Sequence, residues 1–116
     1  MTDFTPAPYH TGGLDFVYGG LIASVIDCHS TGSAAIFWME ANGMKVGAGP
    51  AARFVTARLE VDYMKPTPLT VLHLTGRAEE IRERKVVVST ELAAGGVVTA
   101  KGRAVLVKVP EGRRSP

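Results

Sequence analysis

The chain contains one cysteine, Cys28, which excludes an internal disulfide bond. Its cysteine and three histidines do not stand at the spacings of a zinc site. Common catalytic and nucleotide signatures are missing too, since there is no phosphate-binding P-loop, no dinucleotide fingerprint and no G-x-S-x-G motif. We therefore expect a protein that works without a metal ion or another cofactor.

Charge of one sign is also scarce. The 13 Lys and Arg against 11 Asp and Glu leave a formal net charge of +2, and the basic residues are scattered along the chain. A dedicated nucleic-acid binder concentrates positive charge on one surface. No run of about 20 uninterrupted apolar residues marks a membrane span, and the N-terminus lacks the apolar segment of a signal peptide. The sequence thus predicts a cytoplasmic protein with neither nucleic acid nor a membrane as partner.

The chain does contain enough apolar material for one folded domain. Hydrophobic residues make up 46% of its 116 residues and charged residues 21%, which is typical of globular proteins. We expect a single domain over residues 1–116. It begins with a loop-rich segment at 1–17, including a short strand near Phe4 or Tyr9, and ends in a flexible tail at 110–116.

A long helix is predicted from Gly19 to about Ala41, because apolar side chains recur there at helical spacing. The predicted apolar stripe consists of Ile22, Ile26, Ser33 and Phe37, flanked by Leu21, Val25, Cys28, Ile36 and Met39. Small residues at 30–35 would let the helix lie close to a sheet or to another helix. Asn42-Gly43 supplies the stop signal, and Lys45 to Ala52 is expected to be a flexible connection.

Four strands are predicted after the helix, because the apolar pattern changes to period two. They cover Phe54–Tyr63, about Thr70–Ile81, Arg84–Ala93 and Val97–Val109, with turns at Glu83-Arg84 and Ala94-Gly95-Gly96. In the first strand one face carries Val55, Ala57, Leu59, Val61 and Tyr63, and the other carries Thr56, Arg58, Glu60 and Asp62. Pro66 and Pro68 end this strand.

One helix and four antiparallel strands favour an α+β fold, in which a curved sheet wraps around the central helix. A helix of this length spans roughly 33 Å, which is more than a small sheet can cover. We therefore expect the protein to self-associate as a dimer or a tetramer.

Asp27 is the first candidate for a catalytic residue. It is the only formally charged residue between Leu21 and Trp38, and a carboxylate in a buried helix costs free energy unless it is hydrogen-bonded or neutralised. Thr31 lies one turn later on the same face, so the two side chains could hold a water molecule for nucleophilic attack. The alternatives are a structural acid at Asp27 and a Thr31 hydroxyl that bonds back to the helix backbone.

Gly19 and Gly20 open the same helix. The first helical turn has free backbone N–H groups and the positive end of the dipole, and glycine lets a substrate carbonyl approach closely. An oxyanion site is one interpretation, and a purely conformational role for the glycines is the other. Gly19 and Asp27 are about 12 Å apart along one helix, so no small carbonyl touches both. If they serve one reaction centre, they must come from two antiparallel copies of the helix.

Cys28 and His29 are adjacent in the sequence but cannot form a nucleophile–base pair with each other. Neighbouring helix positions point about 100° apart. We predict structural roles for both, while His10 and His73 have no companion motif.

Two stretches of the sequence combine a Gly-Gly…Asp spacing with a Tyr-x-x-Pro strand end. They are Tyr18-Gly19-Gly20-Leu21-Ile22-Ala23-Ser24-Val25-Ile26-Asp27 and Thr56-Ala57-Arg58-Leu59-Glu60-Val61-Asp62-Tyr63-Met64-Lys65-Pro66. The chain in this respect resembles the hotdog-fold thioesterases of the phenylacetate-degradation (PaaI-like) type. The final strands, with Gly76-Arg77 and Arg84-Lys85-Val86-Val87-Val88, are also similar to that family, so the resemblance covers roughly residues 12–109.

The resemblance implies a hotdog fold and the hydrolysis of acyl-CoA or related thioesters in active sites at a dimer interface. It implies that the N–H of Gly19 polarises the thioester carbonyl and that Asp27 of the other subunit acts as nucleophile or general base. Gly20 and Tyr18 would lie beside the substrate. Thr56 and Thr31 match positions at which relatives carry hydroxyl groups that help to position water.

Arg84 and Lys85 are candidates for contacts with the CoA phosphates, and plain surface solvation is the alternative. Tyr18 replaces the His that the family usually carries before the two glycines, and a phenol donates a hydrogen bond but is a poor base at neutral pH. Gly12 stands where relatives often carry Asn. Both differences concern substrate orientation and rate.

Two other functions stay open at the level of sequence. A non-catalytic hotdog protein could bind an acyl or CoA ligand, or build an assembly, without turnover. A hydratase or dehydratase on the same fold would need a paired His and Asp motif that this sequence lacks.

Overall fold

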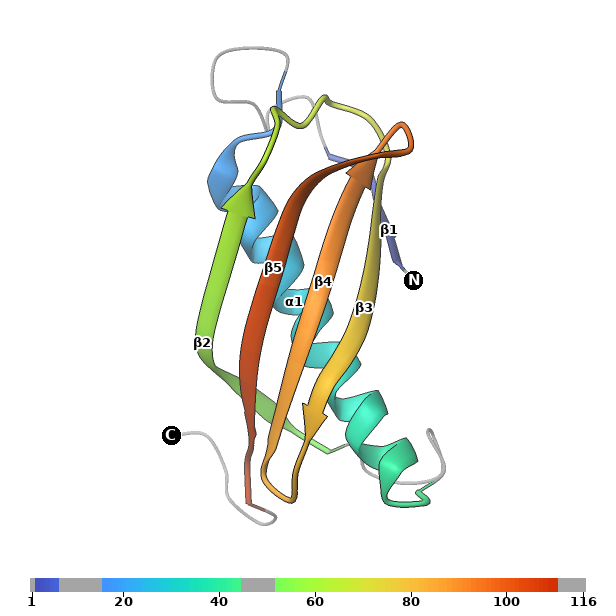
Figure 1. Ribbon diagram of the computed structural model, residues 1–116, viewed down its shortest axis with the longest axis vertical. Helices are drawn as coiled ribbons and strands as arrows, with labels where there is room; N and C mark the ends of the chain where they lie inside the picture. The colour runs from blue at the N-terminus through green and yellow to red at the C-terminus, as the bar shows by residue number, and fades with distance from the viewer. Residues whose placement is uncertain (1, 7–15, 45–51, 111–116) are drawn as a thin grey trace.

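A computed structural model of the protein describes residues 2–6, 16–44 and 52–110. The helix α1 crosses one face of a sheet of five strands (Figure 1). The elements in chain order are β1 (Thr2–Phe4), α1 (Gly19–Ala41), β2 (Phe54–Tyr63), β3 (Leu72–Ile81), β4 (Lys85–Ala94) and β5 (Val97–Lys108).

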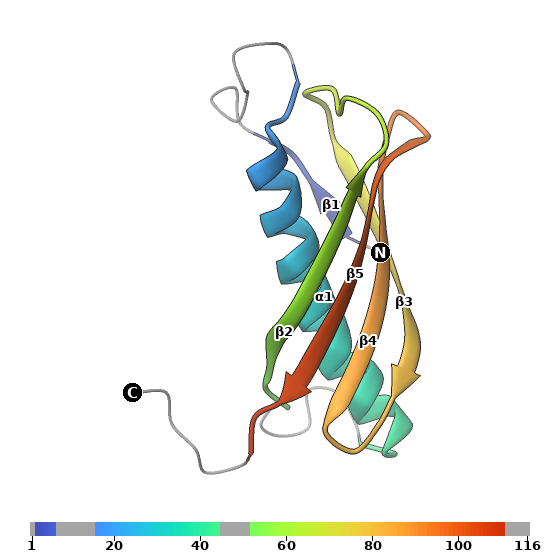
Figure 2. The same ribbon diagram turned by 60° about the vertical axis from the view of Figure 1, so that its left-hand side comes forward.

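The strands lie in the order β1-β3-β4-β5-β2, and all neighbouring pairs are antiparallel. The β4–β5 hairpin turns at Gly95 and Gly96, whose φ angles of 58° and 80° are the positive values that a two-residue hairpin turn requires. β2 precedes β3 in the chain but lies beyond β5, at the edge of the sheet. The sheet curves around the helix (Figure 2), so the predicted α+β arrangement is confirmed.

The sequence pattern predicted the element boundaries closely. α1 and β2 begin and end where predicted, and the ends of the other three long strands differ by at most two residues. The strand expected near Phe4 is β1, which adds a short fifth strand to the four long ones. Tyr9, most of the Lys45–Ala52 connection and the tail after Pro110 lie outside the described residues.

α1 contacts the sheet through residues spaced four apart. The buried positions of its first four turns are Ile22, Ile26, Ser30 and Ala34. Ser33 and Phe37, which were predicted to belong to this stripe, are only half-buried, because the small residues Ser30 and Ala34 face the sheet instead. Ser30 Oγ and Thr90 Oγ1 lie 3.3 Å apart, which satisfies two buried hydroxyls.

Two glycines on the strands let the helix approach the sheet closely. A Cβ atom on Gly102 would collide with Ile26, and one on Gly76 would lie 2.8 Å from His29 Cε1. Real Cβ atoms do not come this close to a neighbour, so both positions need glycine for space. The glycines of the sheet thus make room for the larger side chains Ile26 and His29 of the helix.

The hydrophobic core fills the layer between α1 and the sheet in two clusters. One surrounds Ile26 and Leu74, and the other surrounds Ala34 and Leu106. The helix is therefore held along much of its length, which fixes the positions of the polar groups it carries.

By length and composition alone, α1 is also apolar enough to cross a membrane. Core helices of soluble proteins pass the same test, and this helix packs against a sheet. The cytoplasmic location and the absence of a membrane partner stay predictions.

Candidate active site

Asp27 lies in the middle of α1, half-buried, on the side that faces β2. Thr56 Oγ1 donates a hydrogen bond of 2.5 Å to Asp27 Oδ1. The carboxylate thus has a donor of the kind that a partly desolvated charge requires. Its second oxygen has no side-chain donor within the described part of the chain and is available to a water molecule or a substrate.

A β-bulge carries Thr56 to this side of the strand. Thr56 is paired with one residue of β5 and Arg58 with the next, so Ala57 is the extra residue. The insertion puts Thr56 on the same side as Leu59 and Tyr63, which contact the helix. The strict alternation predicted from the sequence, which grouped Thr56 with the charged outer residues, is therefore wrong at this end of β2.

Thr31 follows Asp27 by one turn, but its hydroxyl is used locally. Thr31 Oγ1 donates to the backbone carbonyl of Asp27 at 2.9 Å, which is the back-bonding geometry that threonine often adopts in helices. Of the two interpretations of Thr31, the structural one describes this arrangement. The hydroxyl that meets the carboxylate is that of Thr56.

The start of α1 offers backbone N–H groups to an outside acceptor. Tyr18, the N-cap residue, is extended, with φ −73° and ψ 151°, and its side chain makes no capping hydrogen bond. The N–H groups of Leu21 and Ile22 donate to the Tyr18 carbonyl at 3.2 and 3.3 Å. Those of Gly19 and Gly20 precede them and are groups that a helix cannot satisfy by itself.

The ring of Tyr18 lies beside Gly20. A Cβ atom added to Gly20 would be 3.0 Å from Tyr18 Cε2, so the absence of a side chain there makes room for the ring. Tyr18 is itself 44% exposed. The partly exposed ring therefore lies beside the first turn of the helix.

Tyr63 fastens the end of β2 to the start of the helix. Its hydroxyl donates to the Gly19 carbonyl at 2.7 Å. A cavity of about 250 Å³ opens here, lined by Val17, Gly19, Ile22, Tyr63, Met64, Lys65, Pro66 and Thr67. Reasoning from the sequence missed the Tyr63–Gly19 contact. The contact could have been expected from the position of Tyr63, because β2 runs antiparallel to the helix and therefore ends near the helix start.

The structure thus assembles two half-sites and keeps them apart. One is Asp27 with Thr56, and the other is Gly19 with Tyr63. Gly19 and Asp27 are separated by about 12 Å of helix, and Thr56 and Tyr63 by about 23 Å of extended strand. Within one protomer, no small group contacts both half-sites.

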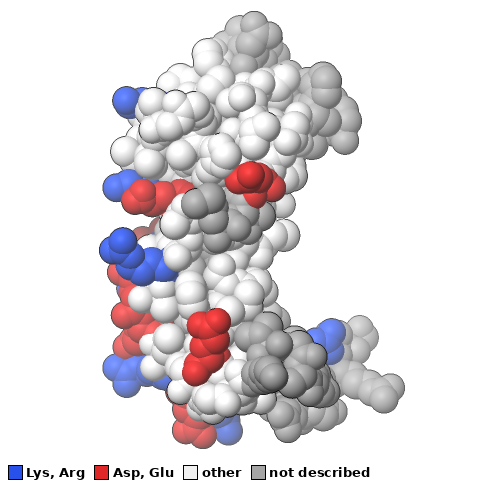
Figure 3. Space-filling model, turned by 90° about the vertical axis from the view of Figure 1, so that its right-hand side faces the viewer, with Lys and Arg blue, Asp and Glu red and all other residues white. Residues whose placement is uncertain are grey.

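Charged side chains are rare on the helix side of the molecule. In Figure 3 they gather along the margin formed by the outer face of the sheet. The 23 residues of α1 include only two charged ones, Asp27 and Glu40. Among the residues that the structure describes, no Lys or Arg forms an ion pair with Asp27.

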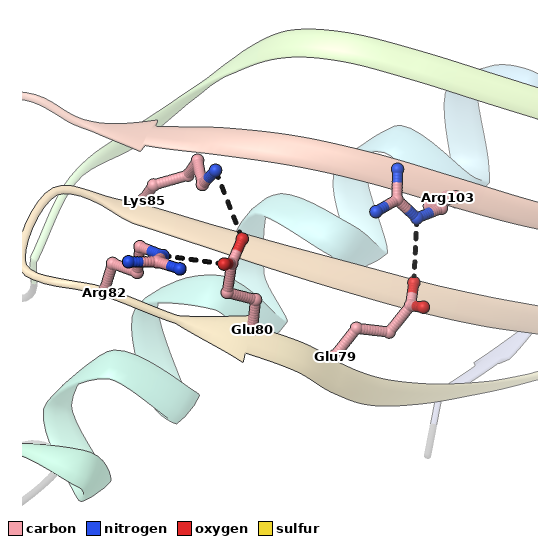
Figure 4. A network of polar contacts seen from close by, with 5 residues as sticks. All are labelled: Glu79, Glu80, Arg82, Lys85 and Arg103. Atoms are coloured by element: carbon pink, nitrogen blue, oxygen red, sulfur yellow. Dashed lines mark hydrogen bonds and ion pairs between the residues drawn. The ribbon is translucent and has the colours of Figure 1, made fainter.

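The turn between β3 and β4 lies at the opposite end of the molecule from the start of α1 (Figure 1), and this turn contains Arg84 and is followed by Lys85. Lys85 Nζ is 3.2 Å from Glu80 Oε2, and Arg82 Nε is 2.6 Å from Glu80 Oε1 (Figure 4). Hydrogen bonds from Arg82 and Lys85 lower the pKa of Glu80. Lys85 is thus already paired with a carboxylate, whereas Arg84 has no ion pair in the described ranges.

The cysteine and the histidines form no nucleophilic or metal site in the part of the chain that the structure describes. Cys28 is exposed, while the His29 ring lies on Gly76. His29 Nδ1 is buried without a hydrogen-bond partner, and burial lowers the pKa of His29, which agrees with a packed, neutral ring. His73 Nδ1 pairs with Asp3 Oδ1 at 2.7 Å across β1 and β3. No three His, Cys, Asp or Glu side chains come together as metal ligands in these segments.

Known proteins share this fold at low sequence identity. A Bacillus halodurans protein crystallised with CoA superposes with a TM-score of 0.74 at 20% identity, over 94% of this chain and 66% of that one. A phenylacetic acid degradation-related protein of Ralstonia eutropha superposes with a TM-score of 0.72 at 19% identity, over 92% and 73% of the two chains. The hotdog fold implied by the sequence resemblance is thereby confirmed.

The sequence itself matches a family over most of its length. The profile of the thioesterase superfamily covers residues 14–101. Acyl-coenzyme A thioesterase THEM4 of Xenopus laevis is 34% identical over 90 residues, which are 77% of this chain and 35% of the relative. The chain thus spans about a third of the length of that curated relative. The protein belongs to the thioesterase superfamily.

Proposed function

We propose that the protein hydrolyses acyl-CoA or related thioesters at a site shared by two copies of the chain. The observation that carries this proposal is the Asp27 carboxylate, held by Thr56 on a nearly uncharged helix that begins without a side-chain cap from Tyr18. Membership of the thioesterase superfamily and the similarity to an acyl-CoA thioesterase support the reaction class. The CoA bound to the Bacillus halodurans protein supports CoA as the thiol component.

In this proposal Asp27 supplies the negative charge that drives the reaction. Its carboxylate either attacks the thioester carbon or takes a proton from a water molecule that attacks. In direct attack, the C–S bond breaks as an anhydride forms between the acyl group and Asp27, and water then hydrolyses this anhydride and frees the carboxylate. In the other route, the attacking water forms the new C–O bond itself. In both routes the products are the carboxylic acid and the thiol, and the water supplies the proton that the leaving thiolate takes up. The N–H of Gly19, at the positive end of the helix dipole, stabilises the charge that develops on the carbonyl oxygen.

The position of β2 supports a shared site. β2 pairs only with β5 among the described strands, so its outer edge is open to a strand from another molecule. Positions 56 and 63 are equidistant, by residue count, from a point between Leu59 and Glu60 within β2. Antiparallel pairing of two β2 strands about that point would therefore bring the Gly19–Tyr63 half-site of one copy beside the Asp27–Thr56 half-site of the other.

Exposed apolar side chains favour the same interface. Val55 is 54% exposed at one end of β2, and Tyr63 and Met64 are 53% and 51% exposed at the other. In an antiparallel pair of β2 strands, the end with Val55 in one copy would cover the end with Tyr63 and Met64 in the other. Large exposed apolar side chains at an open strand edge are a common mark of an association surface.

A second candidate function is ligand binding without turnover. Tyr18 favours it, because a phenol beside the helix start can orient a ligand but is a poor base at neutral pH. Whether the protein belongs to the PaaI-like subtype also stays a prediction, since the likeness to the Ralstonia eutropha protein concerns the fold.

Thiol release from a panel of aliphatic and aromatic acyl-CoA esters tests the proposal. We expect turnover by the wild type and a loss of about 10²- to 10⁴-fold in kcat for Asp27→Asn, which keeps the shape but removes the charge. Size-exclusion chromatography and a melting curve serve as controls for assembly and folding. CoA binding without turnover of any ester would favour the second candidate, and full activity of Asp27→Asn would disprove the catalytic role of Asp27.

A further inference from the structure

We infer that Arg84 and Lys108 form a binding subsite for phosphate groups at the C-terminal end of α1, and that Trp38 holds Lys108 in position. The inference rests on the proposed function, since the nucleotide of a CoA thioester carries the phosphates in question. It replaces the predicted pair of Arg84 and Lys85 by another pair, in which Arg84 comes from the β3–β4 turn and Lys108 from the end of β5.

Backbone hydrogen bonds bring the basic residues of this corner together. The N–H of Lys108 donates to the Arg84 carbonyl at 2.9 Å, and the N–H of Val109 donates to the Arg53 carbonyl at 2.7 Å. Three segments that are distant in the sequence thus meet at one corner of the sheet. The three segments contribute the basic residues Arg53, Arg84 and Lys108.

Trp38 orients one of these cations without neutralising it. Its indole Nε1 donates to the Glu83 carbonyl at 3.0 Å, and its ring meets Phe54 edge-on with 6.4 Å between centroids. Lys108 Nζ lies 4.8 Å from the centre of the indole ring, in a cation–π contact. The ammonium group is therefore held in place while its full charge stays available to an anion.

The side chains of this corner enclose a cavity of about 290 Å³. It is lined by Trp38, Glu83, Arg84, Lys108 and Pro110. Neither Arg84 nor Lys108 makes an ion pair with a carboxylate in the described ranges, in contrast to Arg82 and Lys85, which share Glu80 (Figure 4). A guanidinium and an ammonium group without acidic partners are the donors that phosphate oxygens prefer.

Glu83 is the one carboxylate among the residues that line the cavity. Its negative charge offsets one of the two cations, so the described residues that line the cavity carry an excess of one positive charge. Removal of this carboxylate should therefore strengthen the binding of an anion. Removal of Arg84 or Lys108 should weaken it, so the two kinds of variant are expected to change anion affinity in opposite directions.

The distance from the reaction centre suits a CoA thioester. Trp38 follows Asp27 by three helical turns, about 16 Å, and both side chains face β2, through Phe54 and Thr56. The pantetheine arm contains two amide units and is as long as a peptide of four to five residues, about 15 Å when extended. A thioester that reacts at Asp27 can therefore reach the cavity with its phosphates.

The test compares an acyl-CoA with the matching acyl-pantetheine, which has no phosphate. For Arg84→Gln and Lys108→Gln we expect KM for the acyl-CoA to rise roughly three- to tenfold, with kcat and all constants for acyl-pantetheine unchanged. Trp38→Leu should show the same pattern, and Glu83→Gln should lower KM for the acyl-CoA. Lys85→Gln, in the same hairpin but paired with Glu80, is the matched control and should resemble the wild type.

Direct binding separates a failure of this inference from a failure of the proposed function. If the wild type hydrolyses no ester, calorimetry with CoA, 3′-dephospho-CoA and pantetheine tests the subsite alone. Weaker CoA binding by Arg84→Gln and Lys108→Gln supports it, and the response to 3′-dephospho-CoA tells the 3′-phosphate from the pyrophosphate. Unchanged CoA binding in both variants, or an equal loss with pantetheine, would overturn the subsite.

Discussion

Asp27 depends on one neighbouring side chain for its orientation. Thr56 Oγ1 donates to its carboxylate at 2.5 Å, whereas Thr31, although closer in the sequence, donates to the backbone carbonyl of Asp27. Hydrogen bonds to an ionised group are roughly twice as strong as neutral ones. The two threonines therefore act on different atoms of the same residue, and only Thr56 acts on the group proposed to react.

Thr56→Val removes the hydroxyl and keeps the shape of the side chain. We expect kcat for thioester hydrolysis to fall about 10- to 100-fold, because a hydrogen bond to a charged group contributes about 1.5–3 kcal/mol. Thr56→Ser retains the donor and should stay close to the wild type, and Thr31→Val should have little effect. Steady-state kinetics of the three variants check this, and equal losses in Thr56→Val and Thr31→Val would contradict it.

At the level of elements, the close approach of α1 to the sheet depends on glycines in the strands. Gly102 on β5 lies directly beneath Ile26, which is fully buried. At Gly32, on the helix itself, a Cβ would meet no other described residue within 4 Å beyond the local helix backbone and the adjoining residues. One glycine is thus required by packing, and the other is only tolerated.

Gly102→Ala and Gly32→Ala should shift stability in opposite directions. We expect Gly102→Ala to lower the free energy of unfolding by about 1–3 kcal/mol, because overpacking displaces Ile26 and the helix. Gly32→Ala should raise it by about 0.5–1 kcal/mol through helix propensity. Chemical denaturation of both variants provides the measurement. An unchanged midpoint for Gly102→Ala would mean that the helix can shift away from the sheet at no cost.

At the level of the whole molecule, the two half-sites of one chain cannot act on one carbonyl, and a variant of each half-site can test whether two chains cooperate. Gly19→Pro removes the N–H proposed to bind the oxyanion. Proline is tolerated at the first position of a helix. The preceding residue, Tyr18, already has the extended backbone, with φ −73° and ψ 151°, that a residue before proline adopts.

Asp27→Asn and Gly19→Pro should each be inactive alone and active as a mixture. In a two-fold dimer that shares its sites, a mixed dimer contains one intact site and one doubly altered site. Complete exchange of subunits should restore about a quarter of the wild-type rate. Gly19→Ala, which keeps the N–H, is the matched control for Gly19→Pro. If native mass spectrometry shows mixed dimers and no activity returns, the shared site is wrong.

The sequence by itself determined the local features of this protein. The bounds of α1 and β2 follow from apolar periodicity and from stop signals such as Asn42-Gly43, which act over a few residues. The motif around Gly19 and Asp27 was sufficient to indicate the superfamily. The catalytic roles of these residues stay predictions that the experiments above address.

Only the tertiary structure decided which side chains meet. The bulge at Ala57 turns Thr56 towards Asp27, and a bulge belongs to the register of two strands, so the alternation within one strand cannot reveal it. Tyr63 meets Gly19, and Lys85 is paired with Glu80 while Arg84 is not. The contacts of Thr56 and Tyr63 depend on pairing between segments distant in the chain, about which a local sequence pattern carries no information. The choice between Lys85 and Arg84 depends on how side chains are placed around the β3–β4 turn.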